Sequence, residues 1–404
     1  MTRDEARARD AADPLRGYRD RFALPDGVLY LDGNSLGPLP RDAAPALADM
    51  AGRQWGERLI RSWNEGWIDA PQRIGGKIAA LIGAEPDEVI VADSTSVNLF
   101  KLLVAALRHD PARHTIVSET GNFPTDLHIA EGAVGCVAGA RLNAVARDAL
   151  SNAIDGDTAV VLLTHVHYKT AERFDMASWT AAAHAAGALT LWDLSHSVGA
   201  VPIDLNATGA DLAVGCGYKY LNGGPGAPAF LFVARRLQER LASPLSGWMG
   251  HAAPFDFADA YQPASGMKRW LAGTPSMLAM AGLEAGIDLW HGVDQQAVAT
   301  KSAALFDQFA AIGARLNLEC VSPADPERRG SHISFRHPQA YALCQALIAR
   351  GVIGDFRDPD ILRFGLTPLY LGFEDVWCAG SILADILTSG AYRDPAFAQR
   401  NAVT

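Results

Sequence analysis

A chain of 404 residues, with 49% hydrophobic and 20% charged residues, has the composition of a globular protein large enough for two domains. Its 35 basic and 45 acidic residues give a net charge of −10, which argues against nucleic acid or an anionic membrane surface as the main partner. The five cysteines form no C-x-x-C pair, and the N-terminus lacks the apolar stretch of a signal peptide. No run approaches the ~18 apolar residues of a membrane span. We therefore expect a cytoplasmic protein.

Short apolar segments alternate with helical segments through the middle of the chain. Strands are predicted at residues 88–91, 115–118, 160–164, 189–192, 212–214 and 229–233, and helices at 99–107 and 176–186. Short apolar strands separated by helices are typical of a mostly parallel sheet that is covered on both faces. The sequence therefore predicts an α/β fold, in which ligands bind beyond the carboxyl ends of the strands.

The pattern changes after about Met277. Further helices are predicted at residues 278–289, 297–312 and 340–349, with strands at 332–336 and 361–364. This mixture indicates a smaller α+β domain, which the start of the chain is expected to join because it precedes the first sheet elements. We therefore expect a large domain of residues 40–277 and a small domain of residues 1–39 and 278–404.

One lysine follows a predicted strand and precedes a glycine-rich turn, in the sequence Gly-Cys-Gly-Tyr-Lys-Tyr-Leu-Asn-Gly-Gly-Pro-Gly at residues 215–226. Most lysines lie on solvated surface, but Lys219 is flanked by Tyr218, Tyr220 and small residues, which indicates close backbone approach and a buried site. A desolvated amine can act as a nucleophile or a base. The G-x-G of this stretch is not a dinucleotide fingerprint, because Tyr220 occupies the third glycine position.

Asp193 ends a predicted strand, 219 − 193 = 26 residues before Lys219, so that both are expected at the same rim of the sheet. A carboxylate that pairs with a pyridinium nitrogen keeps the ring protonated, and the protonated ring makes pyridoxal phosphate an electron sink. Lys219 as a Schiff-base lysine and Asp193 as the nitrogen's partner therefore predict a pyridoxal-phosphate enzyme. The alternative for Asp193 alone is a cap of the next helix, and His196 lies either near the ring or in the core.

The sequence Asp-Ser-Thr-Ser-Val-Asn at residues 93–98 opens a predicted helix. Hydroxyls such as those of Thr95 and Ser96, together with the free N–H groups of a helix N-terminus, make an anion site. Serine and threonine are also common helix caps, but three consecutive hydroxyl residues exceed what a cap needs.

A second rim segment, Gly-Asn-Phe-Pro-Thr-Asp at residues 121–126, follows another predicted strand. Phe123 can stack there on a planar ring, and Asp126 can supply a polar contact; the alternative is a proline-directed turn with a buried phenylalanine. His165 and His167 lie on one face of a strand, but no third ligand is written nearby, so we expect no metal site.

Together these segments resemble kynureninase. The resemblance runs from about Tyr30 to Tyr370 and rests on residues 31–37, 93–98, 123–126, 193–196, 211–230, 247–251 and 273–275, on Arg363 and on residues 368–370. It implies an aminotransferase-like, pyridoxal-phosphate-dependent enzyme of fold type I and a homodimer with shared active sites. The reaction it implies is hydrolysis of L-kynurenine to anthranilate and L-alanine, in tryptophan degradation and the kynurenine pathway toward NAD.

The resemblance also implies roles for individual residues. Lys219 would carry the cofactor and remove the Cα proton, Asp193 would pair with the pyridine nitrogen, and Tyr218 would deliver a proton to the β-carbon. Further cofactor contacts fall on Thr95, Ser96, Phe123, Asp126, Thr164 and His196, and on Trp248 and Thr274 from the second subunit. Substrate contacts fall on Ser35, Trp63 and Arg363. The planar fork of an arginine suits the substrate α-carboxylate.

Trp63 occupies a position where animal kynureninases carry a histidine beside the aromatic part of the substrate, which favours plain kynurenine over 3-hydroxykynurenine. Two alternatives remain for the function. An aminotransferase or a cysteine desulfurase shares the scaffold, but no cysteine lies in an evident glycine-rich loop of the small domain. A ligand sensor without catalysis would tolerate loss of Lys219 or Arg363, and both residues are present.

Overall fold

A seven-stranded sheet is the centre of the structure, a computed structural model that describes residues 1–400. The strand order is β2-β8-β7-β6-β5-β3-β4. The strands are β2 (Val89–Val91), β3 (Thr115–Glu119), β4 (Arg141–Val145), β5 (Thr158–Thr164), β6 (Leu189–Asp193), β7 (Leu212–Gly215) and β8 (Phe230–Val233). All pairs among β3, β4, β5, β6 and β7 are parallel, whereas β8 is antiparallel to β7 and β2. The predicted mostly parallel sheet is therefore confirmed.

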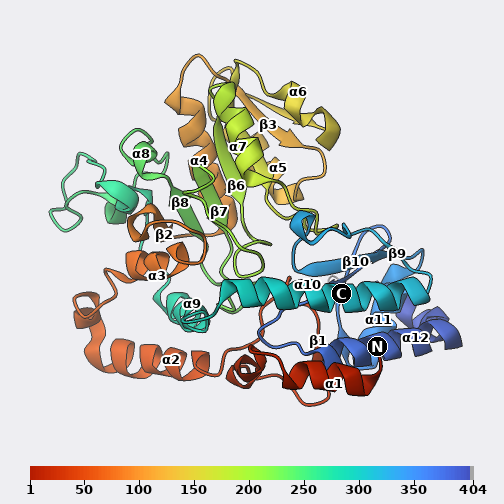
Figure 1. Cartoon of the computed structure of the whole chain (residues 1–404). Coiled ribbons are helices and arrows are strands. Elements are labelled where there is room, and N and C mark those ends of the chain that lie inside the picture. The colour runs from red at the N-terminus through yellow and green to blue at the C-terminus, as the bar shows by residue number, and fades with distance from the viewer. Residues whose placement is uncertain (401–404) are drawn as a thin grey trace.

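Helices cover both faces of this sheet, which forms the upper lobe in Figure 1. Val160 and Leu162 of β5 belong to one core cluster, and Val161 and Leu163 belong to another, because successive side chains of a strand point to opposite faces. The helices of this lobe are α3 (Ala70–Ala79), α4 (Thr95–His109), α5 (Pro124–Val134), α6 (Leu150–Ala153), α7 (Met176–Ala185) and α8 (Arg235–Gln238). Burial on both faces explains why β5 is a continuous apolar run.

A second, antiparallel sheet of four strands lies in the lower right lobe of Figure 1, in the order β12-β13-β10-β9. Its strands are β9 (Glu319–Cys320), β10 (His332–Arg336), β12 (Asp355–Arg357) and β13 (Ile361–Gly365). The helices of this part of the chain are α9 (Met277–Asp288), α10 (Gln295–Arg315), α11 (Ala340–Ala349) and α12 (Phe373–Ser389). The strands at 332–336 and 361–364 that the apolar pattern predicts are thus neighbours in one sheet.

The start of the chain lies beside its end, as the red and blue segments of Figure 1 show. Strand β1 (Leu29–Tyr30) pairs in parallel with β11 (Val352–Ile353), and helix α1 (Arg3–Ala11) packs on α12. These contacts support the assignment of residues 1–39 to the small domain, although the domain boundaries themselves stay a prediction. A helical arm follows: α2 (Ala43–Asp49) packs on α9 and continues as a π-helical segment (Met50–Arg58) and a 3₁₀ turn (Leu59–Trp63).

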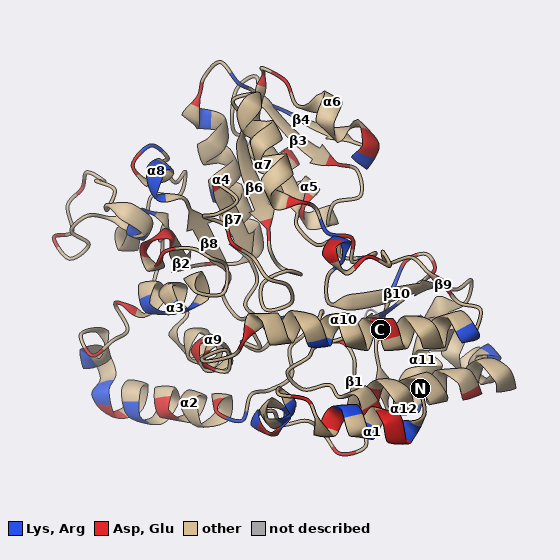
Figure 2. Cartoon of the chain, viewed as in Figure 1, with Lys and Arg blue, Asp and Glu red and all other residues tan. Residues whose placement is uncertain are grey.

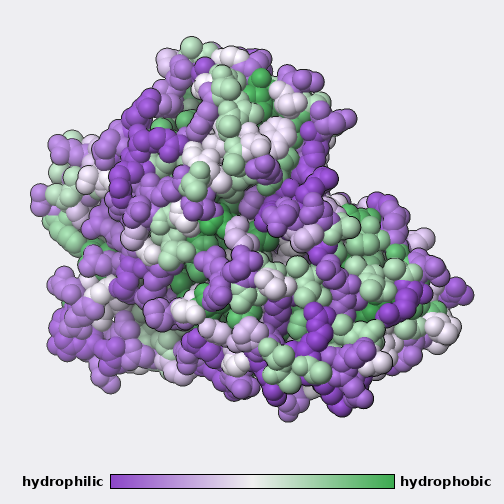
Figure 3. Space-filling model, viewed as in Figure 1, coloured by the Kyte–Doolittle hydropathy of each residue, from purple (hydrophilic) through white to green (hydrophobic). Residues whose placement is uncertain are grey.

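Charged residues are spread over both lobes, with Lys and Arg interspersed among Asp and Glu (Figure 2). Hydrophilic residues cover most of the surface that Figure 3 shows, and hydrophobic residues come to the surface where the two lobes meet. Among residues 1–400, no helix combines the length and the apolar character that crossing a membrane requires.

Asp10 fastens the first helix to the last one. Its carboxylate oxygens accept hydrogen bonds from the backbone N–H groups of Phe373 at 2.6 Å and Glu374 at 2.9 Å, at the N-terminus of α12. We expect Asp10→Ala to lower the free energy of unfolding by about 1 kcal/mol, because two N–H groups of the first turn lose their acceptor. Urea denaturation measures this change. Asp4→Ala, on the same helix but with a 95% exposed side chain, is the control and should unfold like the unaltered protein; equal losses in both variants would contradict the capping role.

Candidate active site

Lys219 lies in a tight loop after β7, and glycines make that loop possible. The N–H of Gly223 donates to the carbonyl of Gly217 at 2.9 Å, which closes the loop around the lysine. A Cβ atom at Gly217 would lie 2.5 Å from the Pro228 carbonyl, and one at Gly223 would lie 2.7 Å from the Gly217 carbonyl. No larger residue fits at either position, so the glycines on both sides of Lys219 are required by packing.

The N-terminal segment of residues 31–37 holds the same loop from the other side. The N–H of Gly37 donates to the Tyr218 carbonyl at 2.8 Å. A Cβ atom at Gly37 would lie 2.2 Å from the Lys219 carbonyl oxygen, so only glycine allows this approach. The backbone that presents Lys219 is therefore fixed by contacts from two distant parts of the chain.

The Lys219 amine meets a histidine and no carboxylate. Its Nζ lies 3.0 Å from Nε2 of His196, which follows β6, and 5.9 Å and 5.8 Å from the ring centroids of Phe123 and Tyr218. Within residues 1–400 no carboxylate forms a salt bridge with Lys219, although its charge favours the ionised forms of the nearby Asp126 and Asp193. Burial and the nearby Lys219 charge lower the pKa of His196 well below its usual value, so this imidazole is neutral. The structure thus brings Lys219, His196, Phe123 and Tyr218 together.

Asp193, at the end of β6, is a buried carboxylate that is 3% exposed. It accepts a hydrogen bond from the Ser195 N–H at 2.8 Å, and in the described part of the chain it forms no ion pair. Burial raises the pKa of Asp193. Burial and the neighbouring Asp193 raise the pKa of Asp126 well above its usual range, so Asp126 keeps its proton beside Asp193. Thr164, at the end of β5, donates to Asp126 at 3.2 Å.

Phe123 is the exposed aromatic ring of this group. The Phe123 ring is 37% exposed and meets the Tyr168 ring edge-on at a centroid distance of 5.2 Å. An exposed aromatic ring at the rim of a sheet is free to stack on a planar ligand.

A cavity of about 480 Å³ lies at the N-terminus of α4. Ser94, Tyr218 and Thr274 line it together with Asp93, and Ser94 caps the helix by accepting from the Val97 N–H at 3.3 Å. Thr95 and Ser96 form the first turn of α4, as predicted from the three hydroxyl residues. The resemblance did not single out Ser94, although its position before two hydroxyl residues is a cap signal.

Trp248 and Trp63 lie apart from this group in the described chain. Trp248 is 38% exposed, and its ring meets Phe255 at a centroid distance of 5.7 Å. Trp63 lies edge-on to Trp67 at 5.6 Å. The single chain therefore does not bring either tryptophan into contact with Lys219.

Arg363 is 1% exposed and is already paired. Its Nε donates to Asp355 Oδ1 at 2.7 Å, and Nη2 donates to Asp355 Oδ2 and, at 3.0 Å, to Ser35 Oγ. Burial alone would raise the pKa of Asp355, but Arg363 lowers it to about 2. The partner of Arg363 within this chain is thus an acidic residue. Asp355 was not predicted from the sequence, although β12 and β13 place it directly opposite Arg363.

A second guanidinium shares that carboxylate. Arg357 Nη2 lies 2.8 Å from Asp355 Oδ2, and the Arg357 side chain is 32% exposed. Burial and the charge of Arg363 lower the pKa of Arg357. Two cations on one carboxylate leave a net positive charge. Burial, together with the charge of Asp355, raises the pKa of the adjacent Asp32 to about 7. Asp32 therefore offsets the positive charge only in part. The cluster of Ser35, Asp355, Arg357 and Arg363 therefore suits an anionic ligand.

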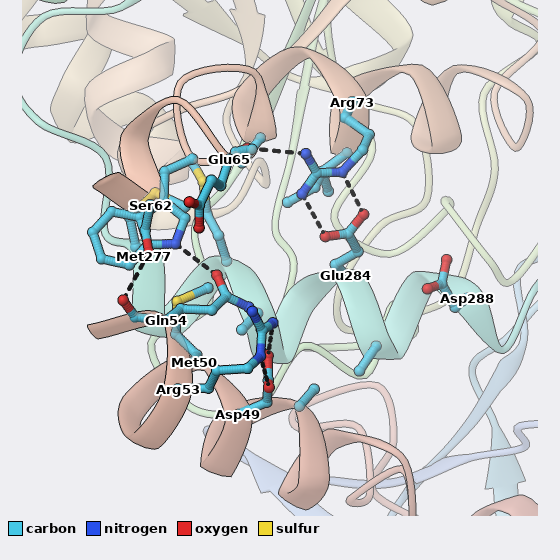
Figure 4. A pocket seen from close by; sticks show the side chains of 18 of the residues that line it. Asp49, Met50, Arg53, Gln54, Ser62, Glu65, Arg73, Met277, Glu284 and Asp288 are labelled. Carbon is cyan, nitrogen blue, oxygen red and sulfur yellow. Dashed lines mark hydrogen bonds and ion pairs between the residues drawn. The ribbon is translucent and has the colours of Figure 1, made fainter. Parts of the chain in front are cut away.

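A further cavity of about 420 Å³ lies between α2, α3 and α9 (Figure 4). Both arginines of its lining are paired: Arg53 Nε lies 2.6 Å from Asp49, and Arg73 Nε lies 2.9 Å from Glu284. Asp42, Glu65 and Asp288 also line the cavity, so it offers an anionic ligand no open cation. The group around Lys219 differs, because within residues 1–400 neither its lysine amine nor its buried Asp193 carboxylate forms a salt bridge. Those two open groups fit pyridoxal phosphate, whose aldehyde and ring nitrogen need such partners.

This fold and this site define a pyridoxal-phosphate-dependent enzyme of fold type I. The chain resembles the solved cysteine desulfurase of Thermococcus onnurineus NA1 at a TM-score of 0.81 and 17% identity, covering 92% of this chain and 98% of that one. The cysteine desulfurase CsdA of Escherichia coli matches at a TM-score of 0.77 and 19% identity, covering 93% and 98%. At these identities, the likeness shows the fold alone.

Sequence relatives decide the family within this class. Residues 298–383 match the family model for the kynureninase C-terminal domain. A protein of Burkholderia mallei (strain SAVP1) that is named kynureninase is 52% identical over 100% of both chains, and one of Pseudomonas fluorescens is 49% identical over the same share. The chain belongs to the kynureninase family.

Proposed function

We propose that this protein hydrolyses L-kynurenine to anthranilate and L-alanine in the cytoplasm, with pyridoxal phosphate carried by Lys219. One water molecule is consumed, and its elements are divided between the two products. The observation that carries the proposal is the Lys219 amine, which lies 3.0 Å from a neutral His196 and forms no salt bridge within residues 1–400. Membership of the kynureninase family supports the same reaction.

The residues that would hold the cofactor surround Lys219. Asp193 would face the ring nitrogen, with the protonated Asp126 beside it, and Phe123 would stack on the ring. The N-terminus of α4, with Ser94, Thr95 and Ser96, would bind the phosphate through N–H groups and hydroxyls. When bound, pyridoxal phosphate supplies the electron sink that makes bonds at the substrate α- and β-carbons breakable.

Two side chains would move protons in the proposed reaction. The Lys219 amine can take the proton from the substrate α-carbon, because no ion pair within residues 1–400 occupies it. Tyr218 can deliver a proton to the β-carbon after the bond to the aryl ketone breaks. Burial raises the pKa of the Tyr218 phenol above its usual value, so this group holds its proton until a carbanion accepts it.

The substrate α-carboxylate would bind at the cluster of Ser35, Asp355, Arg357 and Arg363. Arg363 is held along one edge by two hydrogen bonds to Asp355, so it supplies charge and orientation from a fixed position. Arg357 has the more exposed guanidinium and reaches the same cluster, with Nη2 3.3 Å from Ser35 Oγ. Both arginines therefore take part in the proposed carboxylate site, with Arg357 on its open side.

The proposed enzyme is a homodimer with shared active sites. Most of its exposed large hydrophobic side chains fall in two segments of the chain, and much of both segments lies on the left of Figure 1. The first segment contains Leu36, Leu39, Leu47, Trp55, Leu59 and Ile60, and the second contains Leu245, Trp248, Phe255, Phe257, Tyr261 and Leu278. Apolar surface of this extent is typical of a subunit interface. A second copy is the occupant we propose, because the resemblance assigns Trp248 and Thr274 to the partner's cofactor.

The reaction itself is tested by incubating the purified protein with L-kynurenine and following the fluorescence of anthranilate. We expect turnover in the protein supplied with pyridoxal phosphate and none in Lys219→Ala, because the proton-moving amine is lost. Borohydride should fix the cofactor on the peptide that contains Lys219 in the unaltered protein only. A Lys219→Ala protein that still forms a reducible link would show that another lysine carries the cofactor.

Conservative substitutions distinguish the roles of Arg357 and Arg363. We expect Arg357→Lys to raise KM for L-kynurenine by one to two decades with little change in the unfolding midpoint, since a charged hydrogen bond contributes about 1.5 to 3 kcal/mol. Arg363→Lys should raise KM and also lower the midpoint, because the buried Asp355 loses its two-pronged partner. Steady-state kinetics and thermal denaturation give both quantities. An unaltered KM in Arg357→Lys would remove Arg357 from the carboxylate site.

The dimer is tested at the most exposed residue of each apolar segment. Ile60 and Phe257 are 77% and 78% exposed, so Ile60→Ser/Phe257→Ser should leave the single chain folded but weaken association. Analytical ultracentrifugation should show a shift toward monomer, and kynurenine turnover should fall with the dimer fraction on dilution. Cys136→Ser, at an exposed residue outside both segments, is the control. Unchanged association in the double variant would place the interface elsewhere.

A further inference from the structure

Lys101 is a fully buried lysine in the large lobe, on helix α4, away from the Lys219 loop. Its Nζ lies 2.7 Å from Asp93 Oδ2 and 2.8 Å from the carbonyl oxygen of Trp270. A buried ammonium is costly unless it is paired, so these two acceptors hold Lys101 in one place. The proposed reaction uses none of these contacts directly.

The first acceptor shapes the turn that opens α4. Asp93 has a φ of 48°, in the left-handed region that residues other than glycine seldom adopt. Asp93 is followed by Ser94, the cap of α4, and both residues line the cavity that also contains Tyr218 and Thr274. Lys101, which does not line that cavity, therefore fixes the turn of residues 93–96 through Asp93.

Lys101 also balances a charge. The Asp93 side chain is 32% exposed, into a cavity that has the N–H groups of the α4 N-terminus beside it. An unpaired carboxylate at this place would repel an anion that the helix N-terminus attracts. With Lys101 at 2.7 Å, the pair has no net charge.

The second acceptor connects α4 to the segment that carries Trp248 and Thr274. Trp270 ends the 3₁₀ turn Gly266–Trp270, and two residues later the Ala272 carbonyl accepts from the Met249 N–H at 3.2 Å. A Cβ atom at Gly247 would lie 2.3 Å from that same Ala272 oxygen, so the two backbones touch. The Lys101 ammonium therefore joins the 93–96 turn to this second segment through one atom.

We propose that Lys101 is a positioning residue for the cofactor phosphate: it holds the 93–96 turn in its strained shape, neutralises Asp93 and ties the turn to the segment of Trp248 and Thr274. This inference rests on the proposed function, because it takes the α4 N-terminus as the phosphate site. Lys101 touches neither cofactor nor substrate, and it acts through Asp93 and Trp270.

The chain contains a matched control for the loss of a buried lysine. Lys301 on α10 is 7% exposed, and its Nζ lies 2.6 Å from both Asp13 Oδ2 and the Pro368 carbonyl. It has the same set of partners as Lys101, one carboxylate and one backbone carbonyl, but it lies in the other lobe. Lys301→Met should therefore lower the stability of the protein without a specific effect on the phosphate.

The experiment measures equilibrium binding of two ligands to apoprotein by absorbance titration. Pyridoxal phosphate carries the phosphate, whereas pyridoxal has the same ring and aldehyde without it. We expect Lys101→Met to raise the Kd for pyridoxal phosphate at least about tenfold and to change the Kd for pyridoxal less than about twofold. The reason is that loss of the charged Lys101–Asp93 hydrogen bond disturbs the turn at the phosphate site. Lys301→Met should change neither Kd more than twofold. If Lys101→Met does not fold, Lys101→Gln is measured by the same criterion.

Each outcome distinguishes the inference from the proposed function. Equal weakening of both ligands by Lys101→Met, or no weakening of either, would overturn the phosphate role of Lys101 and leave a purely structural lysine. A selective loss for pyridoxal phosphate that Lys301→Met reproduces would also overturn it. An unaltered protein that forms no reducible link with pyridoxal phosphate would instead contradict the cofactor assignment itself.

Discussion

The N–H of Gly37, which donates to the Tyr218 carbonyl at 2.8 Å, is the contact on which both halves of the site depend. Segment 31–37 lies between the Lys219 loop and the smaller sheet, because the Gly365 N–H donates to the Leu31 carbonyl at 2.7 Å. Ser35 in the same segment reaches the Arg363 cluster. One short stretch of backbone therefore sets the separation between the amine that would carry the cofactor and the cations that would bind the substrate.

Much of the fold follows from apolar patterning, and the exceptions have physical causes. Strands buried on both faces, such as β5 and β6, are visible as continuous apolar runs. Strand β4 (Arg141–Val145) was not predicted, because it lies at the edge of the sheet and is only partly buried, so its sequence has no such run. The helical arm of α2 was also missed, since much of its surface is exposed, including Leu47 and Trp55, and few of its residues are buried.

Some residues of the candidate site could likewise be predicted from the local sequence, and others could not. Lys219, Asp193, Phe123 and Thr95 follow strand ends or open a helix, and local sequence is enough to place such residues at one rim. The Asp355–Arg363 pair could not be predicted without knowing how the strands pair. The two residues lie opposite each other across β12 and β13, and composition does not reveal this register. The resemblance implies that Trp248 contacts the cofactor of a second subunit, a contact that one chain alone does not contain. The likeness to cysteine desulfurases illustrates that the scaffold does not fix the chemistry, which depends on the side chains at the rim.

Segment 31–37 has a consequence for the order in which the protein assembles. Its partners on the smaller sheet are synthesised far later, since Leu31 and Gly365 are 365 − 31 = 334 residues apart. The parallel strand pairs of the large sheet join strands that lie near each other in the sequence, so they can form while the chain is still growing. The Lys219 loop, by contrast, gains its final support only when the chain is nearly complete. A nascent chain would thus contain a folded large sheet before it contained a site able to retain its cofactor.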